Sequence, residues 1–400
     1  MGNTPNVRFK GFTEDWEQRK LGDEATEMLA GGDIDKSRVV KNGQYPIYAN
    51  ALTNDGIVGY YDDYYRVKAP AVTVTGRGDV GHAQARTVDF TPVVRLLAIR
   101  SEHDVYFLEN AINKHGVIVE STGVPQLTVP QLGNYIISFP TTIDEEIKIG
   151  NYFHNLDHLI TLHQQKCDET KEFKKYMLQN MFPQKDEKVP KIRFAGFTGD
   201  WEQRKLGDIT VKIGSGKTPS GGKNAYVETG IPLIRSQNVN GDKVNFADIV
   251  YIDEATDESM ANSRVYTNDV LLNITGASIG RSAVYKGLES ANVNQHVCII
   301  RSIEGHQPDF IQLNLSSDNG QKQIDESQAG GGREGLNFQE IGKMQFSFPS
   351  LNEQKCIGRY FNSLDNLITL HQQKCAALKE FKKYMLQNMF PQKGENKCQN

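Results

Sequence analysis

Long apolar runs and closely spaced cysteines are both missing from this sequence of 400 residues. No stretch of eighteen unbroken apolar residues occurs and the first ten residues are polar, so we expect neither a membrane span nor a secretory signal, and hence a cytoplasmic protein. The five cysteines are odd in number, widely spread and include no C-x-x-C pair. This pattern argues against a disulfide framework and against a structural zinc site.

An excess of positive charge is missing as well. Lys and Arg number 45 against 49 Asp and Glu, and the net charge is -4. Composition alone therefore does not indicate nucleic-acid binding, because such binding draws on Lys and Arg that neutralise phosphates. The hydrophobic content of 38% and charged content of 24% are those of a globular chain, and the length predicts two or three domains.

Catalytic signatures are also absent. The sequence has no Gly-x-Ser-x-Gly elbow, no cysteine in a catalytic context and no Asn/Asp-Pro-Pro-Tyr/Phe segment of the kind that adenine methyltransferases use. The segment Gly214–Thr218 resembles a phosphate-binding loop, but the required earlier glycine is replaced by Val211 and Pro219 follows at once. A nucleotide-dependent enzyme built on this loop stays an alternative, and a flexible binding loop is favoured.

An internal duplication is the strongest positive signal. The segment from Arg8 to Asp23 recurs from Arg193 to Asp208, and the longer segment from Leu156 to Lys185 recurs from Leu364 to Lys393 with four differences in thirty positions. The stretches between them share only a faint skeleton. We infer one fold, present twice, that carries two different surfaces.

The longer repeated segments predict helices. Thr142-x-x-Glu145 and Ser350-x-x-Glu353 are capping-box patterns, and Phe-Pro pairs follow as stop signals. Apolar residues between them alternate at spacings of four and three, which is typical of a coiled-coil seam. The two seams are Ile149, Phe153, Leu156, Ile160, His163, Cys167 and Ile357, Phe361, Leu364, Ile368, His371, Cys375.

Connectivity predicts how these helices pair. The second helix can bury its matching seam on the first only by running antiparallel, which relates the halves by a pseudo-two-fold axis and leaves one domain at each end. His163 and His371 lie in the seams, so we expect an interhelical hydrogen bond between them. A zinc site at His154 and His158 is disfavoured because the second copy has asparagine at both places.

The stretches between the repeats predict strands and loops. Short runs rich in Val, Ile and Tyr, such as Val72–Thr75, Val93–Ile99, Val270–Ile274 and His296–Arg301, are broken by Gly, Asn and Pro. We expect α/β domains whose loops present polar side chains. Asn, Gln and Arg pair with base edges in the DNA major groove, whereas Ser, Thr and Lys suit phosphates, although such clusters are often only solvated loops.

Several motifs resemble type I restriction-modification specificity subunits. They are the openings Trp16–Asp23 and Trp201–Asp208, the Gly-x-Gly-x-Thr-Pro-Ser loop Gly214–Ser220, the run Asn268–Gly280, the Gly335-Leu-Asn337 turn before Phe348-Pro349, and the duplicated helices. The first domain departs from the pattern, since Thr75–Gly81 replaces the Gly-Ala-Ser-Ile-Gly run. The resemblance implies an α+β fold in which two α/β target-recognition domains are separated by two long antiparallel coiled-coil helices.

The resemblance also implies a division of labour. This chain would be the non-catalytic, cytoplasmic specificity subunit that reads the two halves of a bipartite site on double-stranded DNA. Two modification subunits would bind S-adenosylmethionine and methylate adenine N6, and motor-nuclease restriction subunits, using ATP and Mg, would cut unmodified DNA in host defence. No cofactor is expected in the chain itself. A coiled-coil scaffold that binds other proteins through its end domains is the remaining alternative.

The expected domains and DNA contacts can then be assigned. The first target-recognition domain spans residues 1–141, the first spacer helix 142–183, the second domain 184–349, the second spacer helix 350–391 and the tail 392–400. For the first half-site we expect contacts from Arg38, Lys41, Arg77, His82 and Arg86. For the second we expect contacts from Lys217, Thr218, Ser220, Lys223, Arg235, Gln237, Asn238, Asn273, Thr275, Ser278, Arg281 and Arg333.

Overall fold

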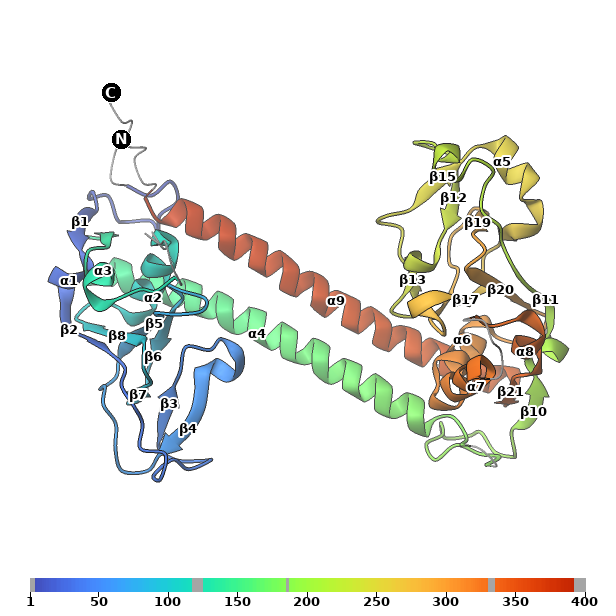
Figure 1. The fold of residues 1–400 in the computed structure, drawn as a ribbon, viewed down its shortest axis with the longest axis horizontal. Helices are drawn as coiled ribbons and strands as arrows, with labels where there is room; N and C mark the ends of the chain where they lie inside the picture. The colour runs from blue at the N-terminus through green and yellow to red at the C-terminus, as the bar shows by residue number, and fades with distance from the viewer. Residues whose placement is uncertain (1–3, 117–124, 185–186, 330–334, 392–400) are drawn as a thin grey trace. The chain divides into compact units, whose positions relative to one another are not determined.

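The computed structural model describes residues 4–116, 125–184, 187–329 and 335–391 (Figure 1). The chain forms two compact units. Unit 1 comprises Met1–Gln165 with His371–Asn400, and unit 2 comprises Lys166–Leu370. No helix in the described part of the chain has the length and apolarity needed to cross a membrane.

Unit 1 is built around a four-stranded sheet with the strand order β2-β8-β5-β6. A three-stranded sheet β4-β3-β7 and a two-stranded sheet β1-β9 complete its strands. Its elements are β1 (Glu17–Lys20), α1 (Leu21–Glu24), β2 (Ala25–Ala30), β3 (Tyr45–Tyr48), the 3₁₀ turn η1 (Thr53–Gly56), β4 (Ile57–Tyr61), β5 (Ala71–Thr75), β6 (Ala83–Arg86), β7 (Thr91–Pro92), β8 (Leu96–Ser101), α2 (Val105–His115), α3 (Val129–Gly133) and β9 (Ile136–Phe139).

Unit 2 repeats this plan with the four-stranded order β11-β20-β17-β18 and a second sheet β15-β12-β19-β16. Two smaller sheets pair β10 with β21 and β13 with β14. Its strands are β10 (Glu202–Lys205), β11 (Thr210–Ser215), β12 (Ile231–Ile234), β13 (Val239–Asn240), β14 (Lys243–Val244), β15 (Val250–Ile252), β16 (Arg264–Val265), β17 (Val270–Asn273), β18 (Ser282–Val284), β19 (Ala291–Val293), β20 (Val297–Ser302) and β21 (Gln345–Phe348). Its short helices and 3₁₀ turns are η2 (Leu206–Ile209), η3 (Gly222–Ala225), η4 (Ser236–Asn238), α5 (Glu254–Ser259), η5 (Ala261–Ser263), η6 (Gly276–Ser278), α6 (Pro308–Ser316), α7 (Asp318–Ala329) and α8 (Phe338–Lys343).

The faint skeleton shared by the two middle stretches has a structural basis. Thr75 and Asn273 end the equivalent strands β5 and β17, and both strands pair antiparallel with β8 or β20. The turns that follow close at Gly81 and Gly280, whose φ angles of 87° and 86° fall in the left-handed region that glycine adopts without strain. The predicted duplication of one fold is therefore confirmed.

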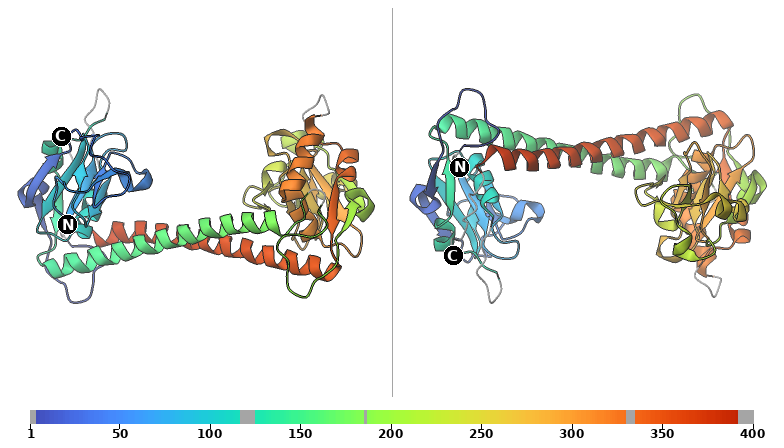
Figure 2. Two further views of the ribbon diagram at one scale, coloured as in Figure 1. Left: turned by 90° about the horizontal axis from the view of Figure 1, so that it is seen from below. Right: turned by 90° about the horizontal axis from the view of Figure 1, so that it is seen from above.

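Two long helices complete the units: α4 (Ile143–Asn180) and α9 (Leu351–Met389). Within unit 1, contacts of α4 with α9 join residue 157 to 382, 160 to 375 and 163 to 371, so the segments run antiparallel. Within unit 2, residue 167 contacts 368 and 174 contacts 365, which again is antiparallel. Figure 2 shows these segments side by side within each unit. The predicted helices and their antiparallel pairing are confirmed.

The end of each long helix closes the core of one unit. In unit 1, Phe390 at the end of α9 packs against Trp16 and Phe107, with ring centroids 5.9 and 5.5 Å apart. In unit 2, Phe182 at the end of α4 takes the same place against Trp201 and Phe310. Each Phe-Pro stop signal thus also supplies a core residue.

The capping-box prediction is confirmed only in part, because Ser350 Oγ accepts from the amide of Glu353 at 3.4 Å, which is one half of the box. Both helices begin where expected, but the Glu145 and Glu353 carboxylates are buried and form bidentate ion pairs with Arg8 and Arg193. All four N–O distances lie between 2.6 and 2.8 Å. The arginines belong to the other repeated segment, so this pair ties each opening segment to the start of a long helix.

Candidate nucleic-acid interface

Strand direction gathers four loops of unit 2 at one edge. Strands β11 and β17 both pair antiparallel with β20, so their C-terminal ends meet the start of β20. Strands β12 and β19 run parallel and end together, and the amide of Asn294 donates to the carbonyl of Ile234 at 3.1 Å. We call the loops 216–223, 235–238, 274–281 and 294–296 the loop edge of unit 2.

Backbone packing fixes the first of these loops. A Cβ atom on Gly216 would lie 1.6 Å from the carbonyl oxygen of Val293, so only glycine fits there. A chain of side-chain hydrogen bonds then joins three loops. Thr218 bonds to Gln295, the Gln295 amide lies 3.0 Å from His296 Nε2, and Thr275 bonds to His296 Nδ1.

Most predicted contacts of unit 2 lie at this edge. Lys217, Thr218, Ser220, Lys223, Gln237 and Arg281 are exposed, and Thr275 and Ser278 are half-buried. In the part of the chain that the structure describes, no carboxylate lies within ion-pair distance of Lys217, Lys223 or Arg281. These three cations are therefore available to an anionic ligand.

Three predicted contacts of unit 2 have hydrogen-bond partners within the fold. Asn273 is fully buried and its Nδ2 donates to the carbonyl of Ser236 at 2.9 Å. Asn238, only 2% exposed, accepts from the amide of Arg235 at 3.0 Å through its Oδ1. The Arg235 guanidinium is half-buried and donates to the carbonyl of Asp248 at 2.6 Å. The prediction of base contacts by Asn238 and Asn273 is corrected, because both amides satisfy buried backbone groups.

The equivalent loops of unit 1 form a second edge, made by residues 49–52, 76–82 and 93–95. The side chain of Asn50 links these loops by two hydrogen bonds. Its Oδ1 accepts from the amide of Gly76 at 2.9 Å, and its Nδ2 donates to the carbonyl of Val94 at 3.0 Å. An open groove of about 640 Å³ lies here, lined by both Arg77 and Arg95. No described residue places a carboxylate within ion-pair distance of either arginine, so both cations are available to an anionic ligand.

The remaining predicted contacts of unit 1 are dispersed. His82 is exposed at the start of β6, on the loop edge. Arg38 pairs with Asp63 at 2.7 Å and lies over the Tyr61 ring, at the opposite end of the β3–β4 hairpin. Lys41 is exposed on that same distant loop. The structure therefore does not bring Arg38 and Lys41 together with Arg77.

Arg86 is a further correction. Its side chain is 5% exposed, pairs with Asp55 at 2.8 Å and covers the Tyr48 ring at 3.6 Å from the ring centroid. Its guanidinium also donates to Thr73 Oγ1 at 3.0 Å. With these partners Arg86 stabilises unit 1 and is not presented to a ligand. Arg333 lies outside the described residues.

Sequence reasoning missed Asn50 and Arg95. No motif surrounds either residue, and their importance comes from loop packing. Arg95 adopts φ = 71°, unusual for a residue with a side chain, and its carbonyl oxygen would lie 2.2 Å from a Cβ on Gly76. A close backbone approach of this kind leaves no periodicity or spacing in the sequence.

The alternatives can also be compared with the structure. Strand β11 leads from Gly214 into an irregular loop and the 3₁₀ turn η3, whereas a phosphate-binding loop opens an α-helix. Among the described residues, no three side chains that could ligate a metal gather at one point. Burial raises the pKa of the Cys298 thiol to about 12, so it is not a nucleophile at neutral pH.

The seam histidines behave as predicted. Nδ1 of His163 lies 3.0 Å from Nδ1 of His371, a hydrogen-bond distance between α4 and α9 in unit 1. Predicted seam residues around them, such as Ile149, Phe153 and Leu364, are buried. The interhelical hydrogen bond is confirmed.

Comparison with known proteins identifies the fold. The family model of the type I restriction modification DNA specificity domain matches residues 13–172 and 198–380. The MjaVIII type I restriction enzyme specificity subunit of Methanocaldococcus jannaschii is 20% identical over 395 residues, 93% of this chain and 91% of that protein. A protein of the same organism named as the MjaX specificity subunit is 24% identical over 211 residues, but the match spans only 52% of this chain and 49% of that protein.

A solved structure shows the same architecture over the whole chain. The crystal structure of the type I restriction-modification S subunit from M. genitalium superposes with a TM-score of 0.65 at 16% identity, and the match covers 98% of this chain and 100% of that one. Two matches to the family model, in the two halves of the duplicated sequence, agree with the repeated fold. The chain therefore belongs to the family of type I restriction modification DNA specificity domains, and it contains that domain twice.

Proposed function

We propose that this chain is the non-catalytic DNA specificity subunit of a type I restriction-modification complex, and that its two loop edges each read one half of a bipartite site. One observation carries this proposal: the two units share a scaffold and strand order but present different polar side chains at equivalent edges. Two different surfaces on one fold suit the recognition of two different short sequences.

Within each edge, the proposed contacts are the accessible ones. In unit 1 they are Arg77, Arg95 and His82, and in unit 2 they are Lys217, Thr218, Ser220, Lys223, Gln237, Thr275, Ser278 and Arg281. Arg can pair with both acceptors of guanine and Gln with adenine, whereas Lys, Ser and Thr suit phosphates. Arg38, Lys41, Arg235 and Arg333 also remain proposed as DNA contacts.

We further propose that the long helices set the gap between the half-sites. Helix α4 is continuous from unit 1 into unit 2, and a helix holds its length at 1.5 Å per residue. The domain borders that we propose are 1–141, 142–183, 184–349 and 350–391, with a tail from 392 to 400. An insertion of four residues near Glu169 adds about 6 Å and is expected to lengthen the gap or abolish recognition.

The same helices offer a repeated surface to partner subunits. Phe173 and Tyr176 of α4 are 47% and 54% exposed, and their repeat counterparts Phe381 and Tyr384 of α9 are 46% and 56% exposed. Equal apolar surfaces of this kind indicate two copies of one partner. We propose that these partners are the two modification subunits, which would supply adenine-N6 methylation with S-adenosylmethionine.

Partner subunits would also compensate for the lack of excess positive charge on this chain. A chain with a net charge of -4 has little capacity to neutralise phosphates alone, so the modification subunits would hold the DNA against the loop edges. The target adenine would be flipped into their pocket. Motor-nuclease restriction subunits, with ATP and Mg, would join the same complex.

The decisive experiment is a genome-wide map of N6-methyladenine in cells that carry this chain with its modification subunit, compared with cells lacking this chain. A bipartite motif that disappears with the chain would establish the function and give both half-sites and the gap. If no motif is lost while the modification subunit is present and active, the protein-binding scaffold becomes the better interpretation.

Side-chain roles can be separated in the same assay. Arg77→Ala or Arg95→Ala at a base contact should cost about 1–3 kcal/mol and relax one position of the first half-site, leaving the second unchanged. Equal weakening on all sequences, with a shallower salt dependence, would reassign that arginine to a phosphate. Arg86→Lys is the matched control, because a buried arginine should affect stability and not the motif.

A further inference from the structure

A buried lysine joins the two long helices to one loop of unit 2. Nζ of Lys174, on α4, lies 2.6 Å from Oδ1 of Asp365 on α9 and 2.8 Å from Oδ2 of Asp242. The side chains are 11%, 16% and 30% exposed. Burial opposes the charge of Lys174, but the two carboxylates outweigh it and raise its pKa, so the lysine remains a cation.

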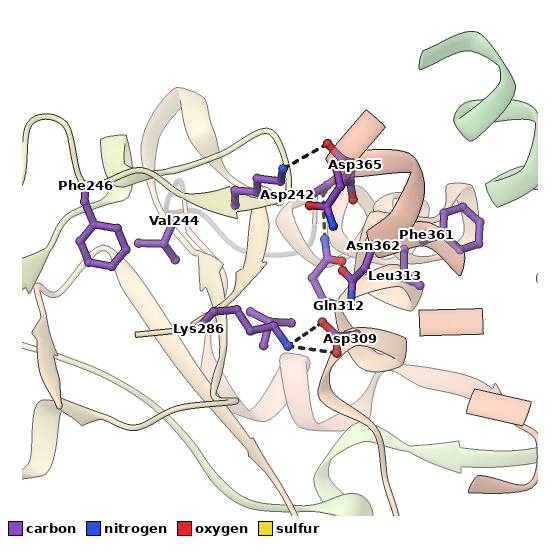
Figure 3. A pocket seen from close by; sticks show the side chains of 13 residues that line it. Asp242, Val244, Phe246, Lys286, Asp309, Gln312, Leu313, Phe361, Asn362 and Asp365 are labelled. Atoms are coloured by element: carbon purple, nitrogen blue, oxygen red, sulfur yellow. Dashed lines mark hydrogen bonds and ion pairs between the residues drawn. The ribbon is translucent and has the colours of Figure 1, made fainter. Parts of the chain in front are cut away.

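Asp242 lies in the two-residue turn of the hairpin formed by β13 and β14. Strands β13 and β14 are joined by Gly241 and Asp242, with φ angles of 60° and 59°, as a two-residue hairpin turn requires. Figure 3 shows Gln312 of α6 pointing at Asp242, with its amide 2.9 Å from Oδ1. The adjacent Lys243 donates to Thr369 Oγ1 at 2.6 Å and to the carbonyl of Asp365 at 3.2 Å.

The other end of this hairpin is the loop edge of unit 2. Strand β13 follows directly from η4, which contains Gln237. The base of the hairpin is closed by two bonds between Asn238 and Asn245, of 2.7 and 3.0 Å. The β13–β14 hairpin, which we call the arm, therefore connects the helices to the turn that carries Gln237.

The repeated sequence supplies an internal comparison. Lys382 and Asp157 are the repeat counterparts of Lys174 and Asp365, and they form the same pair in unit 1 at 2.6 and 2.7 Å. Among the described residues, no loop-edge side chain of unit 1 bonds to Lys382, and the loop after β3 returns through η1 into β4. Among the described residues, a hairpin carboxylate that bonds to this lysine therefore occurs in unit 2 and not in unit 1.

We propose that Asp242 is a positioning residue which, through Lys174 and Asp365, fixes the orientation of the Arg235–Gln237 turn on the helix pair. The inference rests on the proposed function, in which that turn faces the second half-site. The helices then determine how the second half-site is presented, while the first half-site is read by loops without such an arm.

The test uses the full chain in complex with its modification subunit and the variant Asp242→Asn. Asparagine tolerates the left-handed backbone of this position, so the variant removes the charge and not the turn. We expect amide exchange in residues 235–245 to rise about tenfold and methylation to fall about tenfold or to accept a changed gap, since a lost buried ion pair shifts such ratios by that order. The sequence required at the first half-site should not change.

Two variants sharpen the test. Lys174→Met should reproduce both effects, and Lys382→Met, in the identical local sequence of the other repeat, should leave exchange at residues 235–245 unchanged. If amide exchange in residues 235–245 is unchanged in Asp242→Asn, the contact of Asp242 with Lys174 does not hold the hairpin, and the proposal is overturned. Faster exchange with both the methylation level and the gap unaltered would overturn the positioning role. If the unmodified complex directs no methylation, the proposed function fails, and the exchange measurement still decides whether the arm is held by Asp242.

Discussion

The loop edges of the two units differ in chemistry although both units contain a four-stranded sheet with the equivalent strand order. In unit 1 the edge is a groove with Arg77 and Arg95, and Leu52 and Val94 are exposed nearby. In unit 2 the edge is a hydrogen-bonded set of Thr218, Gln295, His296 and Thr275 with free lysines beside it. The comparison teaches that the loops of this fold can differ in chemistry without a change in the sheet.

What the units share is equally informative. Both place a glycine against the end of a neighbouring strand, Gly31 near Val93 and Gly216 near Val293. Both hold their opening segment by a buried arginine-glutamate pair. These shared contacts lie beneath or behind the loop edge, which separates residues that build the scaffold from those that distinguish the units.

The largest effect should come from the shared glycines. Gly216→Ala would place a Cβ 1.6 Å from the Val293 carbonyl oxygen, and Gly31→Ala would place one 2.0 Å from that of Val93. Because backbone must move, each variant should lose more than about 4 kcal/mol of unfolding free energy in urea. Gly214→Ala is the control, since nothing lies within 4 Å of its Cβ. Equal stability of Gly214→Ala and Gly216→Ala would show that the loops are not built on this contact.

The shared ion pairs should come next. Arg8→Met or Arg193→Met leaves a buried carboxylate without its partner, which costs about 3–5 kcal/mol in the unfolding free energy. The two variants should lose similar amounts, because the pairs are equivalent. The exposed pair of Arg204 with Glu202 is the control, and Arg204→Ala should change stability by less than about 1 kcal/mol. A marked difference between Arg8→Met and Arg193→Met would break the equivalence of the units.

A carboxyl group in unit 1 provides a pH-dependent difference. Glu109 of α2 faces the Asp157–Lys382 pair, and burial, with the charge of Asp157, raises its pKa to about 7. Folding therefore favours the protonated acid, and stability falls as pH rises from about 4.5 to about 7, by up to about 3 kcal/mol. Glu109→Gln should thus stabilise unit 1 at about pH 8 and have little effect at about pH 5.

The reverse exchange in unit 2 is the matched control. Gln312 occupies the corresponding place on α6 and donates to Asp242. Gln312→Glu would add a third carboxylate beside Asp242 and Asp365, so it should destabilise unit 2 at high pH. Urea unfolding at both pH values measures each effect, and a pH-independent difference between Glu109→Gln and the unmodified chain would contradict the assignment.

The smallest effect concerns two histidines at equivalent positions of the two units. Burial disfavours the charge of His103, but Glu146 at 2.9 Å and Glu24 at 3.0 Å raise its pKa overall. Burial lowers the pKa of His306, and Gln354, the repeat counterpart of Glu146, accepts from the amide of Gln307 and carries no charge. The contribution of His103 should therefore be present below about pH 6.5 and be lost as pH rises through its higher folded pKa.

Thermal unfolding as a function of pH tests this contrast. The advantage of the unmodified chain over His103→Gln should shrink as pH rises, and its advantage over His306→Gln should shrink as pH falls below about 6.5, because a neutral folded histidine must then compete with a protonated unfolded one. Parallel curves for the two variants would show that Glu24 and Glu146 do not set the charge of His103.

Much of the scaffold could be predicted from local patterns. Repeats revealed the duplication, and the four-three spacing from Ile149 to Cys167 revealed a buried seam. The candidate site was less accessible. Side-chain chemistry predicts Lys217, Arg281 and Asn273 as DNA contacts, and the structure shows the first two exposed and Asn273 fully buried. Asn50 and Arg95 were missed because their place depends on loops that meet only in the folded unit.

The sequence by itself determined the duplicated fold, the two long helices and their antiparallel pairing, because these follow from repeats and periodicity along the chain. The tertiary structure alone decided which polar side chains are free. Arg86 and Arg77 are both arginines of unit 1, yet Asp55 and Tyr48 enclose the first and leave the second exposed. The physical reason is that a polar group becomes structural or available according to the partners that distant segments bring to it, and those partners are not adjacent in sequence.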